Sequence, residues 1–343
     1  MAGKRELILR NQRMDLYKGA AIYAVIAIHI LFPGDVGIAL RVLGRFGVPF
    51  FFLTAGYFNL GASQKALLRR CQRAFLQLFL ACVPYLILGL VLTIRQGTPV
   101  ADWLRSVFSL TALKNFILFH AIPLPYAWQL WFLGALAFVY LMWWAITTLY
   151  HTLNRSFPYT PLAILSTILL VLHLFCGEGF GLMGKEVDTQ FLRNALLDGF
   201  PFFALGNWAA WNRKRIKALH FPWLFLVPIG GVLSLAEAYF AGKQELYLGT
   251  ILLLIGMMGH CIRYRRISDH VVSQLLCFCG QELTLPIFAI HMLVIAALNE
   301  IPALNALHQV AWLLPVLVAV VSTLIAFVLV WAKAVIQIRR IHA

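Results

Sequence analysis

The stretch AFLQLFLACVPYLILGLVLTI, residues 74–94, decides the fold class, because it runs for 21 residues without a charged side chain. A helix needs about 20 mostly apolar residues to cross the hydrocarbon core of a bilayer. Further apolar runs of helical length lie on both sides of it, near residues 17–33, 46–60, 128–149, 159–176, 194–211, 221–240, 246–262, 275–298 and 309–332. We therefore expect an all-α, polytopic membrane protein with about ten transmembrane helices.

The composition of the whole chain supports this expectation. Of the 343 residues, 62% are hydrophobic and only 12% are charged, whereas about a quarter of the residues of a soluble domain are charged. This excludes soluble, disordered and disulfide-scaffold classes. About ten spans of about 20 residues leave no room for a sizeable soluble domain. We expect a single integral-membrane domain over residues 1–343, with no appended soluble domain and no removable signal peptide.

The formal net charge of +15 is explained by membrane topology. If the N-terminus lies inside the cell, 20 of the 28 lysine and arginine residues fall in inner segments and 8 in outer segments. This distribution follows the positive-inside rule and requires an even number of crossings, so both termini are expected in the cytoplasm. Membrane lipids are therefore expected partners, and nucleic acid is not.

A histidine lies deep in the first apolar run, and a lysine precedes it on the same helix. Lys18 and His29 are 11 residues apart. On a helix this is about 16 Å along the axis and about three full turns, so both side chains lie on one face. Ionisable residues inside a span are costly and are often functional. Lys18 would hold an anionic carrier at the inner mouth, and His29 would deprotonate a hydroxyl. The structural alternative is a neutral histidine bonded to a neighbouring helix.

Three further basic residues are candidates for the same chemistry. Arg70 and Arg73 are three residues apart, so they share one helical face at the inner surface. Guanidinium groups are suited to clamp a phosphate, although charges that set topology or contact lipid headgroups have the same pattern. His291 is the second histidine inside an apolar run and is a candidate acid, base or orienting group.

Other residues are candidates for binding an acceptor molecule. Asp198 and Glu237 lie near the outer edges of their spans, where either carboxylate would orient a hydroxyl. Trp128 and Trp131 would grip a sugar or an acyl group, although an interfacial aromatic belt explains them too. The six cysteines have no paired spacing and no clustered histidines, so we expect no metal site.

Five short motifs occur in a fixed order along the chain. They are DLYKGAAIYAVIAIH at 15–29, GVPFFFLTAGYF at 47–58, the Arg70 and Arg73 pair, LWFL at 130–133 and TLPIFAIH at 284–291. With these motifs the sequence resembles the membrane-bound acyltransferase-3 family, bacterial integral-membrane O-acyltransferases of surface glycans. Two positions depart from the family pattern, since Lys18 stands where arginine is usual and Thr54 stands in place of serine.

The resemblance implies an acetyl-CoA-dependent O-acetyltransferase of the bacterial inner membrane. It would move an acyl group from cytoplasmic acetyl-CoA to a sugar hydroxyl of a lipid-linked or cell-surface polysaccharide. His29 would be the general base, with His291 as the second catalytic residue and Lys18, Arg70 and Arg73 binding the donor. Two alternatives stay open, a proton-coupled transporter or flippase and a non-catalytic relative, and so does a homo-oligomeric state.

Overall fold

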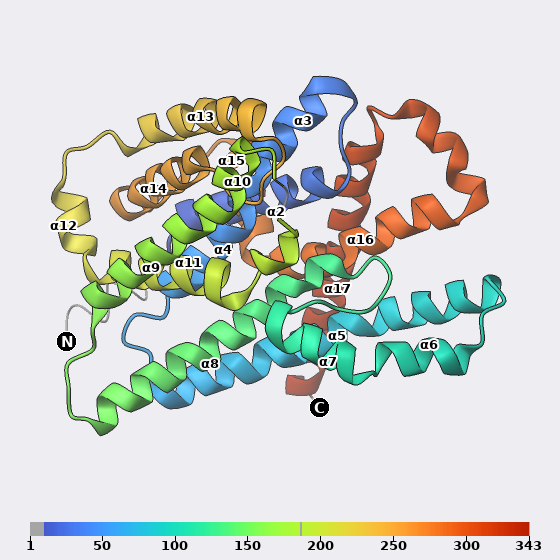
Figure 1. Cartoon of the computed structure of the whole chain (residues 1–343), viewed down its shortest axis with the longest axis horizontal. Helices are drawn as coiled ribbons and strands as arrows, with labels where there is room; N and C mark the ends of the chain where they lie inside the picture. Colours follow the sequence, from blue (N-terminus) through green and yellow to red (C-terminus); the bar gives the residue numbers. More distant parts are fainter. Residues whose placement is uncertain (1–9, 186, 343) are drawn as a thin grey trace. The chain divides into compact units, whose positions relative to one another are not determined.

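The computed structural model describes residues 10–185 and 187–342, including the side chains of these residues except 305, 306 and 338–342. Helices make up most of this described part, and no strand occurs in it (Figure 1). The all-α fold class expected from the sequence is therefore confirmed.

Seven of the helical segments are long and apolar enough to cross a membrane. They are Gly34–Tyr57, Gln64–Arg95, Trp128–Thr152, Tyr159–Leu182, Trp223–Ala241, Val271–Glu300 and Leu314–Gln337. A shorter apolar helix covers Leu248–Arg263. The chain is thus a multi-pass membrane protein. The expected count of about ten spans and the cytoplasmic location of the termini stay predictions, and residues 1–9 and 343 lie outside the described residues.

The chain is divided into two compact units. Unit 1 consists of Met1–Val48, Leu219–Ala236 and Leu248–Ala343, and unit 2 consists of Pro49–Ala218 and Glu237–Tyr247. Two of the four boundaries fall inside helices, α4 (Gly47–Tyr57) and α13 (Leu226–Ala241), and the other two lie at helix ends. The single domain over residues 1–343 stays a prediction.

Unit 1 is built around α2 (Gln12–His29), which carries the first predicted run. Its other elements are α3 (Gly34–Leu43), η1 (Gly44–Phe46), η6 (Trp223–Phe225), α14 (Leu248–Arg263), α15 (Val271–Phe278), η7 (Cys279–Leu283), α16 (Thr284–Glu300), η8 (Pro302–Val310) and α17 (Leu314–His342). Asn11 caps the start of α2, because its side-chain oxygen accepts a hydrogen bond from Met14 N at 3.1 Å. Its Nδ2 donates to the carbonyl of Cys261 at 2.8 Å. The cap therefore also fixes α2 to the end of α14.

Glycines bring α2 into backbone contact with α15 and η7. A Cβ atom on Gly19 would overlap with the carbonyl oxygen of Leu276, and one on Gly280 would overlap with the carbonyl oxygen of Asp15. Close backbone approach through small residues is the usual way in which membrane helices pack, because lipid provides no hydrophobic driving force between them. The π-helical turn η7 continues into α16, so this contact also sets the position of α16 beside α2.

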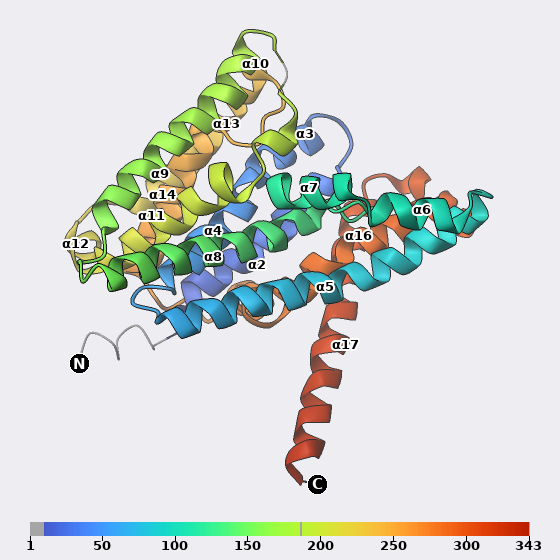
Figure 2. The ribbon, with the colours of Figure 1, turned by 60° about the horizontal axis from the view of Figure 1, so that its bottom comes forward.

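Unit 2 contains a pair of long helices and a second group of shorter ones. Its elements are α5 (Gln64–Arg95), α6 (Val100–Val107), α7 (Leu110–Phe119), η2 (Trp128–Leu130), α8 (Trp131–Thr152), α9 (Tyr159–Leu174), η3 (Phe175–Gly179), α10 (Phe180–Leu182), η4 (Thr189–Phe191), η5 (Ala195–Gly199), α11 (Phe200–Trp211) and α12 (Arg213–Ala218). Helices α5 and α8 lie side by side (Figures 1 and 2). Gln129 Nε2 donates to the buried Tyr85 hydroxyl at 2.6 Å and ties the start of α8 to α5.

The second group of unit 2 is packed through glycines as well. A Cβ atom on Gly56 in α4 would overlap with the carbonyl of Phe203 in α11, and one on Gly206 would overlap with the carbonyl of Leu53. Asn207 Nδ2 donates to the Gly56 carbonyl at 3.1 Å across the same contact. These reciprocal contacts fix the PFFFLTAGY segment against α11.

The glycine contact of unit 1 can be tested by adding one methyl group. We expect Gly280→Ala to lower the free energy of unfolding by about 1–3 kcal/mol, because the new methyl group must displace backbone atoms of α2. The measurement is thermal unfolding of the detergent-solubilised protein. Gly179→Ala is the matched control, since its Cβ would make only ordinary van der Waals contacts, the nearest at 3.4 Å to the side chain of Phe175 and the next at 3.9 Å to the carbonyl oxygen of Leu174, and would leave stability nearly unchanged. Equal melting temperatures for the two variants would contradict the assigned contact.

Candidate active site

The two deeply placed histidines predicted from the sequence lie together in unit 1. His29 is the last residue of α2, and His291 lies within α16. Their ring centroids are 5.4 Å apart, and the ring planes are inclined by 36°. The structure therefore brings two imidazoles, 262 positions apart in the sequence, into van der Waals range of each other.

The hydrogen bonds of His291 define which of its nitrogens is available. Its side chain is fully buried, and its Nδ1 lies 3.1 Å from the carbonyl oxygen of Ile287. A carbonyl oxygen only accepts, so Nδ1 carries the hydrogen and Nε2 keeps its lone pair. Within the described part of the chain, Nε2 has no hydrogen-bond partner. A buried acceptor without a partner is costly, and its position beside His29 makes the pair a candidate catalytic centre.

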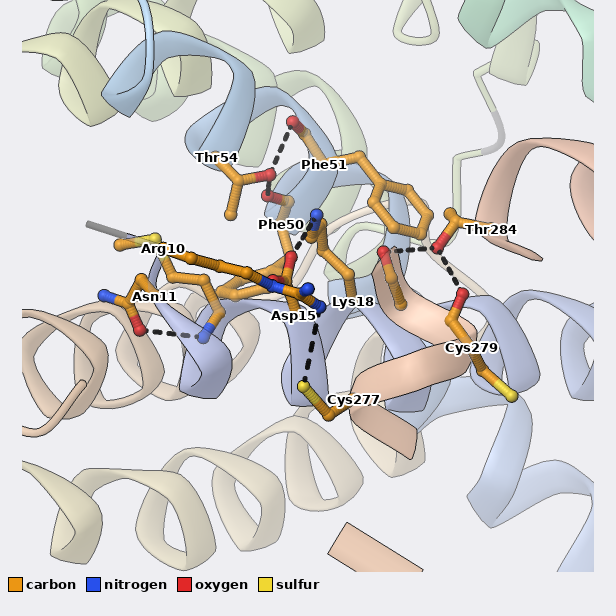
Figure 3. A network of polar contacts seen from close by, with 12 residues as sticks. Arg10, Asn11, Asp15, Lys18, Phe50, Phe51, Thr54, Cys277, Cys279 and Thr284 are labelled. Carbon is orange, nitrogen blue, oxygen red and sulfur yellow. Dashed lines mark hydrogen bonds and ion pairs between the residues drawn. The ribbon is translucent and has the colours of Figure 1, made fainter. Parts of the chain in front are cut away.

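At the other end of α2, Lys18 forms part of a small charged cluster (Figure 3). Its Nζ lies 2.6 Å from Asp15 Oδ1, and Arg10 Nε donates to Asp15 Oδ2 at 2.8 Å. Arg10 Nη2 also lies 4.0 Å from the sulfur of Cys277. The predicted cation is thus in place on α2, but it shares a buried carboxylate with a second cation that the sequence analysis did not single out.

The predicted arginine pair belongs to unit 2, where its two members differ in environment. Arg70 is half-buried and donates to the side-chain oxygen of Asn59, whose Nδ2 donates in turn to the Ala55 carbonyl at 2.6 Å. The Tyr140 hydroxyl also bonds to Asn59 and lies near the Arg70 charge. Arg73 is exposed. The guanidinium of Arg70 is therefore fixed by hydrogen bonding, and Arg73 is a surface charge on the same helix.

Asp198 lies in unit 2 within the π-helical turn η5 and is buried. Close by, Arg193 and Glu245 form a two-point ion pair, with both nitrogen–oxygen distances at 2.6 Å. Burial alone would lower the pKa of Arg193, but attraction to Glu245, Asp198 and Asp188 raises it above its ordinary value. The guanidinium is therefore permanently charged, and it anchors the segment that carries Asp198.

The remaining predicted residues are placed as follows. Trp131 is nearly buried and packs against Phe52 with 6.4 Å between ring centroids. Trp128 is half-exposed and lies 5.6 Å from the ring of Tyr126. Glu237 is partly buried in α13. Of the two tryptophans, Trp128 thus offers the more accessible ring face.

Sequence reasoning missed several residues that the structure joins to the predicted ones. Lys18 had a local signal toward Asp15, which lies three residues away on the same helical face, whereas Arg10 lies five residues from Asp15 and before the start of α2, so helical spacing did not relate them. Asn59 and Glu245 had none, because their partners lie 11 and 52 residues away. Arg45 is also buried, in η1.

The ion pair that anchors the Asp198 segment gives a stability prediction. We expect Glu245→Gln to destabilise the protein by about 3 kcal/mol, because it removes the carboxylate that pairs directly with the partly buried Arg193. Asp102→Asn is the matched control. Asp102 and Arg105 form an exposed pair at 3.0 Å, so the loss there stays below about 1 kcal/mol. Both are measured as shifts in the thermal unfolding midpoint, and equal shifts would show that the Arg193 pair is solvated.

Comparison with known proteins gives the family of this chain. The sequence matches the family described as acyltransferase domain over residues 11–331. No curated protein and no solved structure matches it. The match covers almost the whole chain, including both units and all five motifs noted in the sequence, which confirms the resemblance drawn from them. The chain belongs to the acyltransferase-3 family of membrane acyltransferases.

Proposed function

We propose that this membrane acyltransferase moves an acetyl group from acetyl-CoA to a sugar hydroxyl of a lipid-linked or cell-surface polysaccharide, with His29 as the general base. The observation that carries the proposal is the contact between His29 and His291 in unit 1. A general base needs a lone pair within reach of the proton that it removes. The buried His291 and the partly exposed His29 beside it are imidazoles, which carry such lone pairs in their neutral form.

The proposed reaction has a simple proton balance. The acceptor hydroxyl gives its proton to His29 as its oxygen bonds to the thioester carbonyl carbon. The carbon–sulfur bond then breaks, and the leaving thiolate takes the proton from the His29 imidazolium, which restores the neutral base. His291 Nε2 is held as an acceptor by the bond of Nδ1 to Ile287, so it would receive a hydrogen bond from the His29 imidazolium. A covalent route, in which His29 first takes the acetyl group, predicts labelled protein when the acceptor is left out.

The proposed contacts of the acetyl-CoA donor are the cations on α2 and α5. Lys18 lies about 16 Å from His29 along the axis of α2, so phosphates held near Lys18 would leave the thioester to extend toward the histidines. Arg70, fixed by Asn59, and Arg73 are proposed donor contacts because guanidinium groups bind phosphates at two points. Each of these cations acts by binding.

The acceptor is proposed to contact residues of another kind. Asp198 and Glu237 would accept hydrogen bonds from sugar hydroxyls, and Trp128 and Trp131 would stack against sugar rings. The half-exposed ring of Trp128 supports this role for it more strongly than the nearly buried Trp131 does. The bacterial inner membrane as the location belongs to the same proposal.

The proposed base is tested with purified protein, radiolabelled acetyl-CoA and candidate glycan acceptors. We expect His29→Ala to lower the rate of label transfer by at least about a hundredfold, since general-base catalysis contributes that much or more. His291→Ala is expected to cause a smaller loss. His151→Ala is the matched control, because His151 is an exposed histidine at the end of α8. Transfer by His29→Ala at the wild-type rate would show that another group is the base.

The proposed donor role of Arg70 is tested through the residue that holds it. We expect Asn59→Ala to raise KM for acetyl-CoA by about tenfold with little change in kcat, because a guanidinium without its fixed partner binds the donor more weakly but does not touch the reacting atoms. Arg69→Ala, which removes an exposed charge one residue away, is the control. An equal effect of both variants on KM would mean that only bulk positive charge matters there.

A further inference from the structure

Asp15 holds two cations at once, one on each of its carboxylate oxygens (Figure 3). We infer that Arg10 and Lys18, positioned by Asp15, form a binding site for one phosphate group of the acyl donor. The identity of the donor as a coenzyme A thioester rests on the proposed function. The site itself rests on the charge and exposure of these three side chains and on the unused hydrogen-bond donors of Arg10 and Lys18.

The charges of the cluster do not cancel. Two cations and one carboxylate leave a net charge of +1. The side chains of Asp15 and Lys18 are only 10% and 23% exposed and pair with each other, so the additional positive charge lies on Arg10, whose side chain is 44% exposed. The cluster therefore lacks one opposite charge at a position that solvent reaches. An anion bound at the cluster would supply that opposite charge, and a phosphate group also offers several oxygens as acceptors.

Both cations keep hydrogen-bond donors for such an anion. Arg10 uses Nε on Asp15, and its Nη2 lies 4.0 Å from the sulfur of Cys277, which is a weak acceptor. Its Nη1 donates to none of the described residues, and its side chain is 44% exposed. Lys18 has three N–H donors, of which Asp15 takes one. Because both nitrogens are bound to oxygens of the same carboxylate, the two cations flank one side chain, and we expect a single phosphate to contact both.

The two cations contribute different geometry. An ammonium group acts as a point charge, whereas a guanidinium presents a planar fork that matches two phosphate oxygens. Lys18 alone therefore lacks a fixed planar fork for two phosphate oxygens, and Arg10 supplies one. Asp15 acts as the positioning residue, since it fixes both groups and its own backbone is held against Gly280.

The location of the cluster fits a donor with separate charged and reactive ends. Arg10 and Lys18 lie at the N-terminal end of α2, and His29 is its last residue. In a coenzyme A thioester, an extended pantetheine arm separates the phosphates from the thioester. A phosphate at this cluster would leave the arm to run along α2 toward the histidine pair.

The test measures equilibrium binding of coenzyme A, a product that requires no catalysis, to the full-length protein by calorimetry. We expect Arg10→Gln to weaken binding of coenzyme A by at least about tenfold, as for loss of a charged hydrogen bond. Binding of pantetheine, which has no phosphate, should not change. Arg10→Lys keeps the charge and the pair with Asp15 but lacks the fork, so we expect an intermediate loss. The double variant Arg10→Gln, Lys18→Arg restores a guanidinium and should recover most of the affinity.

Arg13→Gln is the matched control. Arg13 lies in the first turn of α2, three residues after Arg10, and its guanidinium donates to the carbonyl oxygens of Tyr264 and Arg266. Wild-type affinity in Arg10→Gln, or equal weakening of coenzyme A and pantetheine, would overturn the inference and leave the proposed function standing. If the wild-type protein transfers acetyl groups but binds coenzyme A no better than pantetheine, the inference is also wrong. Absence of both binding and transfer in the wild type would instead refute the proposed function, and this inference with it.

Discussion

The contact between Gly280 and the backbone of Asp15 is the constraint on which unit 1 depends. It allows η7 to lie directly against α2, and Gly19 makes the reciprocal approach to Leu276. Lipid gives two apolar helices no hydrophobic reason to associate, so close van der Waals contact must stabilise them instead. The same contact has chemical consequences at both ends of α2. It fixes the residue whose carboxylate holds Arg10 and Lys18, and it leads through η7 into the helix that carries His291.

Some polar groups of unit 1 have hydrogen-bond partners that hold the fold together, whereas one buried group keeps an acceptor without a partner among the described residues. Thr284 donates to the carbonyls of Cys279 and Gly280 and so adds side-chain hydrogen bonds to the π-helical turn (Figure 3). The Tyr23 hydroxyl bonds to Thr323 at 2.9 Å and joins α2 to α17. His291 differs from both, because its Nε2 is buried without a partner within the described residues. Membrane proteins retain costly polar groups mainly where they act on a substrate or a proton.

The sequence predicts some parts of this protein well and others not at all, for physical reasons. Long apolar runs predict membrane helices because the bilayer sets their length, and the spacing of Lys18 and His29 follows from helix geometry alone. Contacts between distant segments have no such local signature. The sequence of α2 does not predict that His29 contacts His291, and the sequence of the GYFN segment does not predict that Asn59 bonds to Arg70. The π-helical turn at 279–283 also breaks the 3.6-residue period by which a face could be counted.

The Arg10–Asp15–Lys18 cluster explains how the chain can have a lysine at position 18, where the family usually has arginine. A guanidinium at that position would already supply the planar fork, and a second arginine beside it would add little to a two-point phosphate contact. With an ammonium group at position 18, another residue has to supply the planar guanidinium. Asp15 holds the guanidinium of Arg10 on one carboxylate oxygen and Lys18 on the other. One carboxylate therefore lets a point charge and a planar group act together. Asp15 also competes with a bound phosphate for both cations, so it would weaken binding of the donor's phosphate. Weaker binding favours release of the coenzyme, which must leave after each transfer.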